Sequence, residues 1–350
     1  MPDSRRARPS RLILVTGAHV VAESAIELMR RRGFRVHHID RDDFKPDELR
    51  EALDGAAGYL IGGNEEVLAE HFQCATDLEA VAWVGTDYRG YVPGWAEAFR
   101  LGIAFVNAPG ANAPSVAEFA MLLALTMSRP FTAAIAGARR TEPPVMLPGR
   151  DLHGRTLGVI GLGRIGARVA SIARHGFGMR VVYTAPRRNV ALENAMDITY
   201  LPKSELLSTA DIVSLHRPAL AAGEAAELGR TEFQLLRPET LVVNTGHLNL
   251  LDLRELLTAA RTKGIRAAVD GLGGGDVWDA LVRLGPEQFV AVPMMAFNTR
   301  DANERASLAV AEAVCDVLDG GTSELVNNPD WRAVRAQFTG GPSELGSERG

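Results

Sequence analysis

The sequence lacks the features that would place the chain in several large classes of protein. Only two cysteines, Cys74 and Cys315, occur in 350 residues, too few for a disulfide framework, and no Cys/His cluster has the spacing of zinc ligands. We expect both to be small buried hydrophobes. The longest apolar run, Phe119 to Leu125, is far shorter than the roughly 18 residues of a membrane span. No apolar segment of signal-peptide type follows the basic start of the chain. These absences predict a cytoplasmic protein.

An excess of basic charge is also absent. The formal net charge is −5, so we expect neither a nucleic acid nor an anionic membrane as partner.

The length predicts about two domains, at roughly 150 residues each. The last segment, 341–350, is rich in Gly, Ser and Glu, and we expect it to be disordered.

What the chain does contain is a repeated alternation of short apolar runs with helical segments. This pattern predicts parallel sheets covered by helices, and six runs in the second half suit a doubly wound nucleotide-binding domain. The predicted strands of the first half are Leu12–Thr16, Arg35–Ile39, Gly58–Ile61, Ala80–Val84 and Ile103–Asn107. Those of the second half are Thr156–Gly161, Arg180–Thr184, Ile212–His216, Thr240–Asn244, Arg266–Asp270 and Phe289–Pro293.

The segment between the two series breaks the rhythm. Ser115 can cap a long apolar helix that runs from Val116 to about Ser128. Residues 129–150 then contain four prolines, and we interpret them as an excursion from the body and a candidate dimer arm.

The strongest local motif is a G-x-G-x-x-G turn that follows a predicted strand and opens a predicted helix. In such a turn the first glycine makes the tight bend, the second admits a pyrophosphate and the third lets the helix pack closely. The helix N-terminus then faces the phosphate charge. The predicted cofactor-binding residues of the turn are Gly161, Gly163, Arg164, Ile165 and Gly166.

The end of the next strand predicts the choice of cofactor. Thr184 stands where NAD-preferring domains place an acidic residue, and Arg187 and Arg188 follow closely. Guanidinium groups suit a 2′-phosphate, so this segment favours NADP(H) over NAD(H). The alternative is that the two arginines belong to a solvated loop.

Several longer segments resemble the D-isomer-specific 2-hydroxyacid dehydrogenases, over about Gly55 to Asn328. They are Val84–Asp87, Val106–Glu118, Ala210–His216 and Val242–Thr245. The resemblance implies a Rossmann domain, 113–297, inserted into a flavodoxin-like doubly wound substrate domain, 1–112 and 298–340. It also implies an active site in the cleft, a small-molecule substrate and a homodimer formed through the nucleotide domains. Further cofactor contacts are implied for His216, Pro218, Asn244, Thr245 and Asp270, and substrate contacts for Gly62, Gly63, Val84 and Gly85.

The chemistry of that family needs an Arg, a Glu and a His, and this chain departs from all three. The Arg position carries His247, the Glu position carries Gly273 and the His position carries Met294. Loss of a general acid–base group costs about 10²- to 10⁴-fold in rate. Ordinary 2-hydroxyacid dehydrogenation by the family's mechanism is therefore not expected.

His247 is the candidate replacement, because an imidazole can act as acid, base or hydrogen-bond donor near neutral pH. The alternative is a histidine that only fills the space of the lost arginine. Asn298 is a second, weaker candidate, and no metal site is predicted. Met294 and Phe297 make one wall apolar, which suits a larger or less polar substrate than lactate or glycerate.

Two main hypotheses follow. The first is an NADP(H)-dependent oxidoreductase with a rebuilt site that reduces an unusual carbonyl, an imine or an activated double bond. The second is a catalytically inactive NAD(P)-binding homologue that acts as a sensor, partner subunit or regulator. A scaffold that binds no nucleotide is disfavoured by Gly161, Gly163 and Gly166.

Overall fold

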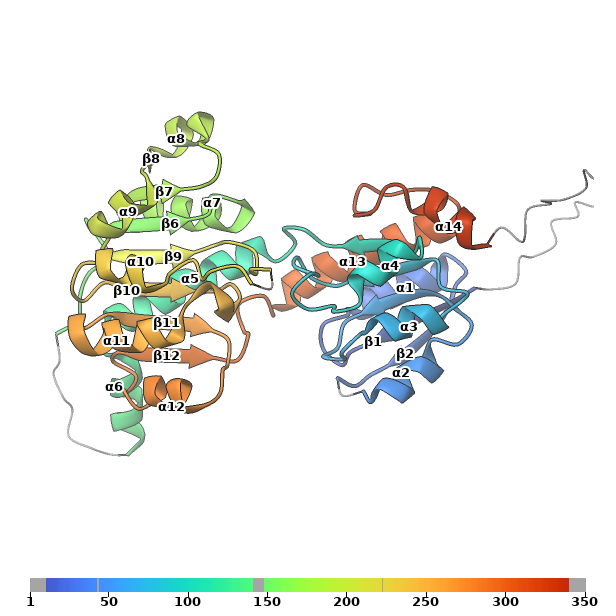
Figure 1. Cartoon of the computed structure of the whole chain (residues 1–350), viewed down its shortest axis with the longest axis horizontal. Coiled ribbons are helices and arrows are strands. Elements are labelled where there is room, and N and C mark those ends of the chain that lie inside the picture. The colour runs from blue at the N-terminus through green and yellow to red at the C-terminus, as the bar shows by residue number, and fades with distance from the viewer. Residues whose placement is uncertain (1–10, 43, 141–147, 222, 340–350) are drawn as a thin grey trace, which may run out of the picture. The chain divides into compact units, whose positions relative to one another are not determined.

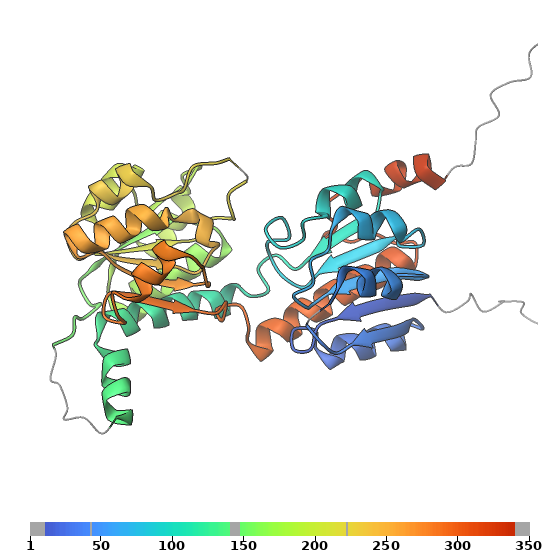
Figure 2. The same cartoon turned by 60° about the horizontal axis from the view of Figure 1, so that its bottom comes forward.

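The computed structural model describes residues 11–42, 44–140, 148–221 and 223–339, and the chain divides into two units (Figures 1 and 2). The first unit comprises Met1–Asn112 and Arg300–Gly350, and the second comprises Ala113–Thr299. In sequence, the second unit therefore interrupts the first. The sequence analysis placed the two crossings after residue 112 and before residue 298. The tail 341–350 lies outside the described residues.

The first unit contains a five-stranded parallel sheet with the order β2-β1-β3-β4-β5. Its inner strands are continuous apolar runs because helices cover both faces of the sheet. The strands are β1 (Leu12–Thr16), β2 (Arg35–Ile39), β3 (Ala56–Ile61), β4 (Ala80–Trp83) and β5 (Ala104–Asn107). The helices are α1 (Glu23–Arg31), α2 (Pro46–Ala52), α3 (Ala69–Cys74), α4 (Trp95–Arg100), α13 (Arg300–Leu318) and α14 (Trp331–Thr339).

The side chains of each inner strand alternate between two cores. Ile13 and Val15 of β1 belong to one core with Val310 and Val314 of α13. Leu14 belongs to the other, on the opposite face of the sheet. This period of two follows from strand geometry. The carboxyl ends of β1 and β3 lie side by side, because the two strands are paired, and the strand order reverses between them.

The second unit contains a seven-stranded parallel sheet with the order β12-β11-β10-β9-β6-β7-β8. The strands are β6 (Thr156–Ile160), β7 (Arg180–Thr184), β8 (Thr199–Tyr200), β9 (Ile212–Leu215), β10 (Leu241–Asn244), β11 (Arg266–Asp270) and β12 (Phe289–Val292). The α-helices are α5 (Ala113–Ser128), α6 (Phe131–Arg139), α7 (Arg164–Ser171), α8 (Val190–Met196), α9 (Lys203–Thr209), α10 (Arg230–Leu235), α11 (Leu253–Lys263) and α12 (Asp276–Val282). A short π-helix, η1 (Ile172–Gly176), continues α7, and a 3-10 helix, η2 (Leu248–Leu250), follows β10.

The predicted fold class, two doubly wound parallel sheets, is confirmed. The strand orders match those of a flavodoxin-like sheet in the first unit and a Rossmann sheet in the second. In the second unit the order reverses between β6 and β9, and ligands of such sheets bind at the carboxyl ends of the strands beside that point.

Three local predictions were wrong. The long apolar helix begins at Ala113, because Pro114 suits a first helical turn, and Ser115 lies inside the helix with its hydroxyl 2.9 Å from Thr299 Oγ1. The second sheet has a seventh strand, β8, which is only two residues long. Cys74 is exposed at the end of α3, whereas Cys315 is buried as expected.

The excursion after Ser128 contains a helix. Residues 131–139 form α6, and residues 141–147 lie outside the described part of the chain. Over the described ranges no single helix is long and apolar enough to cross a membrane, and α5 with α6 meets the criterion only as a pair bent by 70°.

Candidate functional site

The G-x-G-x-x-G turn joins β6 to α7, and two of its glycines are required by packing. Gly161 has φ of +98°, and a Cβ there would lie 2.5 Å from the carbonyl oxygen of His216. A Cβ on Gly166 would lie 2.0 Å from the carbonyl oxygen of Gly161. A Cβ on Gly163, in contrast, would meet no heavy atom of the described chain within 4 Å. The second glycine is therefore the one whose hydrogen faces open space.

The first turn of α7 has no side-chain cap. Gly163 is its N-cap residue and forms no side-chain hydrogen bond. Of the next two residues, Arg164 is exposed and Ile165 is half-buried. The first N–H groups of a helix have no partner within the helix, and a phosphate satisfies them well. This turn therefore fits the pyrophosphate of a dinucleotide.

Beyond β7, Arg188 is already paired. Its Nε and Nη2 donate to the two carboxylate oxygens of Glu193 at 2.8 and 2.7 Å, and its guanidinium lies 5.8 Å from the centre of the Tyr200 ring. Glu193 also accepts a hydrogen bond from Tyr183 at 2.8 Å, and the hydrogen bonds from Arg188 lower the pKa of this carboxyl. The sequence prediction that both arginines are available to a 2′-phosphate must therefore be corrected for Arg188.

Arg187 and Thr184 remain at the position where a ribose would lie. Arg187 is exposed, and no ion pair or hydrogen bond of its side chain is found among the described residues. Thr184 ends β7 and is half-buried. One guanidinium group and one hydroxyl therefore follow β7 in the segment where the sequence predicts the ribose to bind.

The segment after β9 lies against the glycine turn. His216 Nε2 lies 2.8 Å from Ser214 Oγ, and burial lowers the pKa of His216 to about 4. The ring is therefore neutral at physiological pH. Arg217 Nη1 donates to Glu227 at 2.6 Å. Pro218 follows these residues and is exposed.

At the end of β10 the buried Asn244 builds a turn. Its Nδ2 donates to the carbonyl of His247 at 3.1 Å, and its Oδ1 accepts from the N–H of Gly246 at 3.0 Å. Both ends of the amide predicted to contact the cofactor therefore hold the chain that carries His247.

Two further polar groups lie on this turn. The Nδ1 atom of His247 accepts a hydrogen bond from the N–H of Asn249 at 3.2 Å, which places the proton of the neutral ring on Nε2. The hydroxyl of Thr245 is buried and has no hydrogen-bond partner among the described residues. An orphaned buried hydroxyl is uncommon and indicates a missing partner.

Asp270, at the end of β11, positions the loop after β12. Its two oxygens accept hydrogen bonds from the N–H groups of Met295, at 2.6 Å, and Ala296, at 2.8 Å. Burial raises the pKa of Asp270, and these two hydrogen bonds oppose the rise. The carboxylate predicted to bind cofactor therefore acts first on the backbone of the loop.

The Trp278 ring occupies the space that a side chain at residue 273 would need. A Cβ on Gly273 would lie 2.6 Å from Cε3 of the Trp278 ring, which is buried and packs edge-on against Phe289. The loop has no room for a longer side chain at residue 273 while the indole keeps this position.

The loop after β12 is apolar and partly strained. Met294 has a left-handed backbone with φ of +49°, which is rare for a residue other than glycine, and its side chain is 45% exposed. Phe297 is half-buried, and Asn298 is exposed with its N–H donating to the carbonyl of Met295. The predicted apolar wall thus includes exposed methionine at the edge of the sheet.

In the first unit, Gly62 and Gly63 are buried against the end of β1. A Cβ on Gly17 would lie 2.4 Å from the carbonyl of Gly62, so the two turns cross without room for side chains. Val84 is also buried, and Gly85 lies against the indole of Trp83, where a Cβ would be 2.4 Å from Nε1.

A buried carboxylate lies under the Gly62–Gly63 turn. Glu65 accepts hydrogen bonds from Tyr59, at 2.7 Å, and from Thr16, while its Oε2 is buried without a partner in the described ranges. A Cβ on Gly63 would lie 2.2 Å from that oxygen. A carboxylate at this place opposes the binding of an anion by the turn, because like charges repel each other.

The structure thus groups the predicted residues within each unit. The glycine turn, His216, the 244–247 turn, Asp270 and Met294 follow neighbouring strands of one sheet and share its carboxyl edge. Gly62, Gly63, Val84 and Gly85 follow neighbouring strands of the other sheet. Sequence reasoning missed Glu193, Glu65 and the contact between Gly273 and Trp278, because no spacing signals a contact made across a loop.

Comparison with known proteins agrees with this geometry. Residues 119–280 match the model of the D-isomer specific 2-hydroxyacid dehydrogenase, NAD binding domain. A glyoxylate reductase of Korarchaeum cryptofilum (strain OPF8) is 32% identical over 257 residues, which are 70% of this chain and 74% of that protein. The chain belongs to the D-isomer-specific 2-hydroxyacid dehydrogenase family.

Other members support the same assignment. A glyoxylate reductase of Aeropyrum pernix is 36% identical over 238 residues, 64% of this chain and 69% of that one. The crystal structure of TT0316 protein from Thermus thermophilus has a TM-score of 0.78 at 29% identity and covers 90% of this chain and 99% of its own. Members of the family are oxidoreductases with an NAD-binding domain, and this dehydrogenase-family chain keeps that domain.

The open space at Gly163 predicts that a substitution there changes dinucleotide binding but not stability. We expect Gly163→Ala to leave the melting temperature unchanged and to weaken dinucleotide binding at least tenfold, because the methyl group would occupy the approach of the pyrophosphate. Gly166→Ala should lower the melting temperature by several degrees instead, because its Cβ collides with backbone. Thermal unfolding and a fluorescence titration with NADPH measure both effects. Unaltered binding by Gly163→Ala would contradict the assignment of the turn.

The half-buried His216 imidazole predicts a pH dependence of stability. The pKa of His216 is lowered to about 4 from an ordinary 6.5, so between these values the unfolded chain takes up a proton that the folded chain does not. Stability present above pH 6.5 is therefore lost as the pH falls toward 4. We expect the wild type to lose on the order of 1–3 kcal/mol more than His216→Gln between pH 7 and pH 4, as measured by urea unfolding. Identical pH profiles would refute this assignment.

Proposed function

We propose that this chain is an NADP(H)-dependent oxidoreductase with a non-standard active site, which reduces an unusual carbonyl, imine or activated double bond. The observation that carries the proposal is the position of the Trp278 ring, which occupies the space that a side chain at residue 273 would need. In the family that space belongs to the Glu that orients the catalytic His, and the His position itself carries Met294 with a left-handed backbone. The nucleotide turn remains complete beside this change.

The residues present fit a nicotinamide dinucleotide. The uncapped start of α7 and the open face of Gly163 would hold its pyrophosphate, and the unpartnered hydroxyl of Thr245 offers a further hydrogen bond on the same edge. When bound, the cofactor supplies the hydride. The protein then has to bind the acceptor, exclude water and deliver one proton.

His247 is the group in position to deliver that proton. Its Nδ1 accepts a hydrogen bond from the N–H of Asn249, so the proton of the neutral ring lies on Nε2. Asn244 holds the carbonyl of the same residue and fixes the turn. An activated acceptor such as an iminium needs little further assistance, which suits a site with a single imidazole. Met294 and Phe297 would supply an apolar wall for such a substrate.

The alternative is a catalytically inactive NAD(P)-binding homologue that acts as a sensor, partner subunit or regulator. One observation favours it. The contact between His247 Nδ1 and the N–H of Asn249 is also the cap of the turn η2, so the histidine has a structural role without any chemistry. Turnover separates the two functions.

A homodimer is part of the proposal. Four apolar side chains of the neighbouring helices α5 and α6 are 37–53% exposed: Leu122, Leu125, Phe131 and Ile135. Exposed apolar side chains gathered on adjacent elements are typical of a surface that another chain covers.

The proton donor predicts a defined kinetic result. With a panel of ketones, imines and enones, we expect NADPH to be consumed with at least one acceptor, and His247→Ala to lower kcat by about 10²- to 10⁴-fold. The affinity for NADPH should not change, and His247→Gln, which keeps a hydrogen-bond donor but cannot release a proton, should be as slow as His247→Ala. Absence of turnover with the whole panel would favour the inactive homologue, and full activity of His247→Ala would exclude His247 as the donor.

The unpaired guanidinium group predicts the choice of cofactor. We expect Arg187→Ala to weaken NADP(H) binding by about ten- to a hundredfold and to leave NAD(H) binding unchanged, because only NADP(H) carries a phosphate for it. Arg188→Ala should have a smaller effect on NADP(H), because Arg188 is held by Glu193. Dissociation constants from isothermal titration measure both. An equal loss of affinity for NAD(H) and NADP(H) would show that Arg187 does not bind the 2′-phosphate.

A further inference from the structure

The amino edge of the second unit's sheet carries a charged groove, at the end of the strands opposite the nucleotide turn. Two cavities, of about 240 and 350 Å³, share Ser128, Arg150, Glu239 and Arg266 and are therefore continuous. We call this space the amino-edge groove. Arg266 is the first residue of β11, and Thr240 and Asp211 directly precede β10 and β9. None of these residues belongs to the site described above.

Arginine dominates the lining of the groove. Five arginines and four acidic residues line it: Arg129, Arg150, Arg155, Arg237, Arg266, Asp151, Asp211, Glu239 and Glu287. The acids do not match the arginines one to one, because Asp211 is shared by Arg155 and Arg237 at 3.7 and 3.2 Å. The groove thus keeps a surplus of positive charge.

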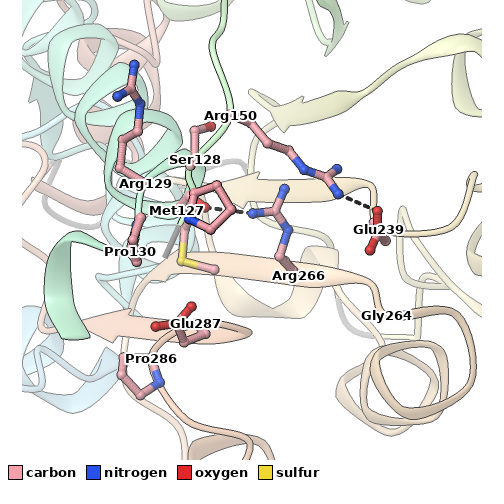
Figure 3. Close-up of a pocket in the computed structure, with 12 residues that line it drawn as sticks. Met127, Ser128, Arg129, Pro130, Arg150, Glu239, Gly264, Arg266, Pro286 and Glu287 are labelled. Atoms are coloured by element: carbon pink, nitrogen blue, oxygen red, sulfur yellow. Dashed lines mark hydrogen bonds and ion pairs between the residues drawn. The ribbon is translucent and has the colours of Figure 1, made fainter. Parts of the chain in front are cut away.

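Arg266 is the centre of that surplus. Its Nη1 donates to the carbonyl of Met127 at 2.7 Å, and no carboxylate lies within ion-pair distance of it in the described part of the chain. Figure 3 shows its guanidinium between that carbonyl and the side chains of Arg150 and Glu239. Burial and the neighbouring charges of Arg150 and Arg155 lower the pKa of Arg266, and the charge of Glu239 partly opposes this shift. A half-buried cation near other cations is costly unless an anion joins it.

The carbonyl of Met127 uses only part of the Arg266 side chain. A guanidinium group has five N–H donors, so one bond to the last turn of α5 leaves most of them for the cavity. Arg150 is 43% exposed at its side chain and lies on the same cavity wall, and its pairing with Glu239 involves Nη2 alone, unlike the two-point pairing of Arg188 with Glu193. Two forks of this kind match the oxygens of a phosphate group.

We propose that the amino-edge groove binds a small phosphate-bearing anion, with Arg266 and Arg150 holding the phosphate and Arg237 and Arg155 extending the site. The ligand class follows from the lining, because two adjacent cavities accept more than one phosphate-sized group and the donors are guanidinium forks. The site lies apart from the nucleotide turn of the same sheet and is independent of the reaction that the turn supports.

The test is isothermal titration of the full chain with inorganic pyrophosphate, and with inorganic phosphate, at low and matched ionic strength. Arg266→Gln keeps a donor for the Met127 carbonyl but removes the charge, and we expect it to weaken pyrophosphate binding about tenfold or more. Arg237→Gln, at a more exposed position, should weaken it severalfold without loss of stability. Added salt should weaken binding to the wild type.

One control variant removes an arginine outside the groove. Arg230→Gln removes an exposed arginine of the same unit, paired with Glu255. It should bind pyrophosphate within about twofold of the wild type. Equal binding by the wild type and Arg266→Gln would overturn the proposal, as would an equal loss of binding in Arg230→Gln. A change of oligomeric state in Arg266→Gln, with no anion bound by either protein, would overturn it as well and would assign the groove to a second copy of the chain.

Discussion

The contact of Gly166 with the carbonyl of Gly161 sets the geometry on which the nucleotide edge depends. The two residues approach so closely that α7 must start directly over the end of β6. The carbonyl of His216 closes the same turn from the side of β9. Because these contacts involve backbone, they leave only one face of the turn open, at Gly163. The first N–H groups of α7 face the same opening, and this coincidence makes the turn a phosphate site and not merely a tight bend.

Most polar groups of the carboxyl edge are used to build that edge. Asn244 forms a turn, and Asp270 holds the loop after β12 by two backbone N–H groups. Glu193 holds Arg188. Among the described residues, few side chains of this edge lack a partner: the Thr245 hydroxyl and the Arg187 guanidinium. A site with so few free groups suits chemistry in which the bound cofactor does most of the work.

The sequence predicted those features that depend on local pattern. Buried strands and the glycine turn were found because apolar runs and glycine spacing are properties of consecutive residues. The start of α5 was missed by three residues, since Pro114 fits inside a first turn as well as before it. Pairings such as Arg188 with Glu193, or Glu65 with Tyr59, depend on side-chain direction across a loop, and no periodicity records that direction. The space shared by Gly273 and Trp278 is of the same kind.

That shared space also bears on how such a site changes over generations. A carboxylate at residue 273 and an indole at residue 278 cannot both be accommodated in the present loop. A lineage that carries Trp278 must therefore alter the indole before an acid at residue 273 brings any benefit, and the intermediate lacks both a filled core and an acid. The order of the two substitutions thus matters, and an acid at residue 273 requires more than one substitution in this loop.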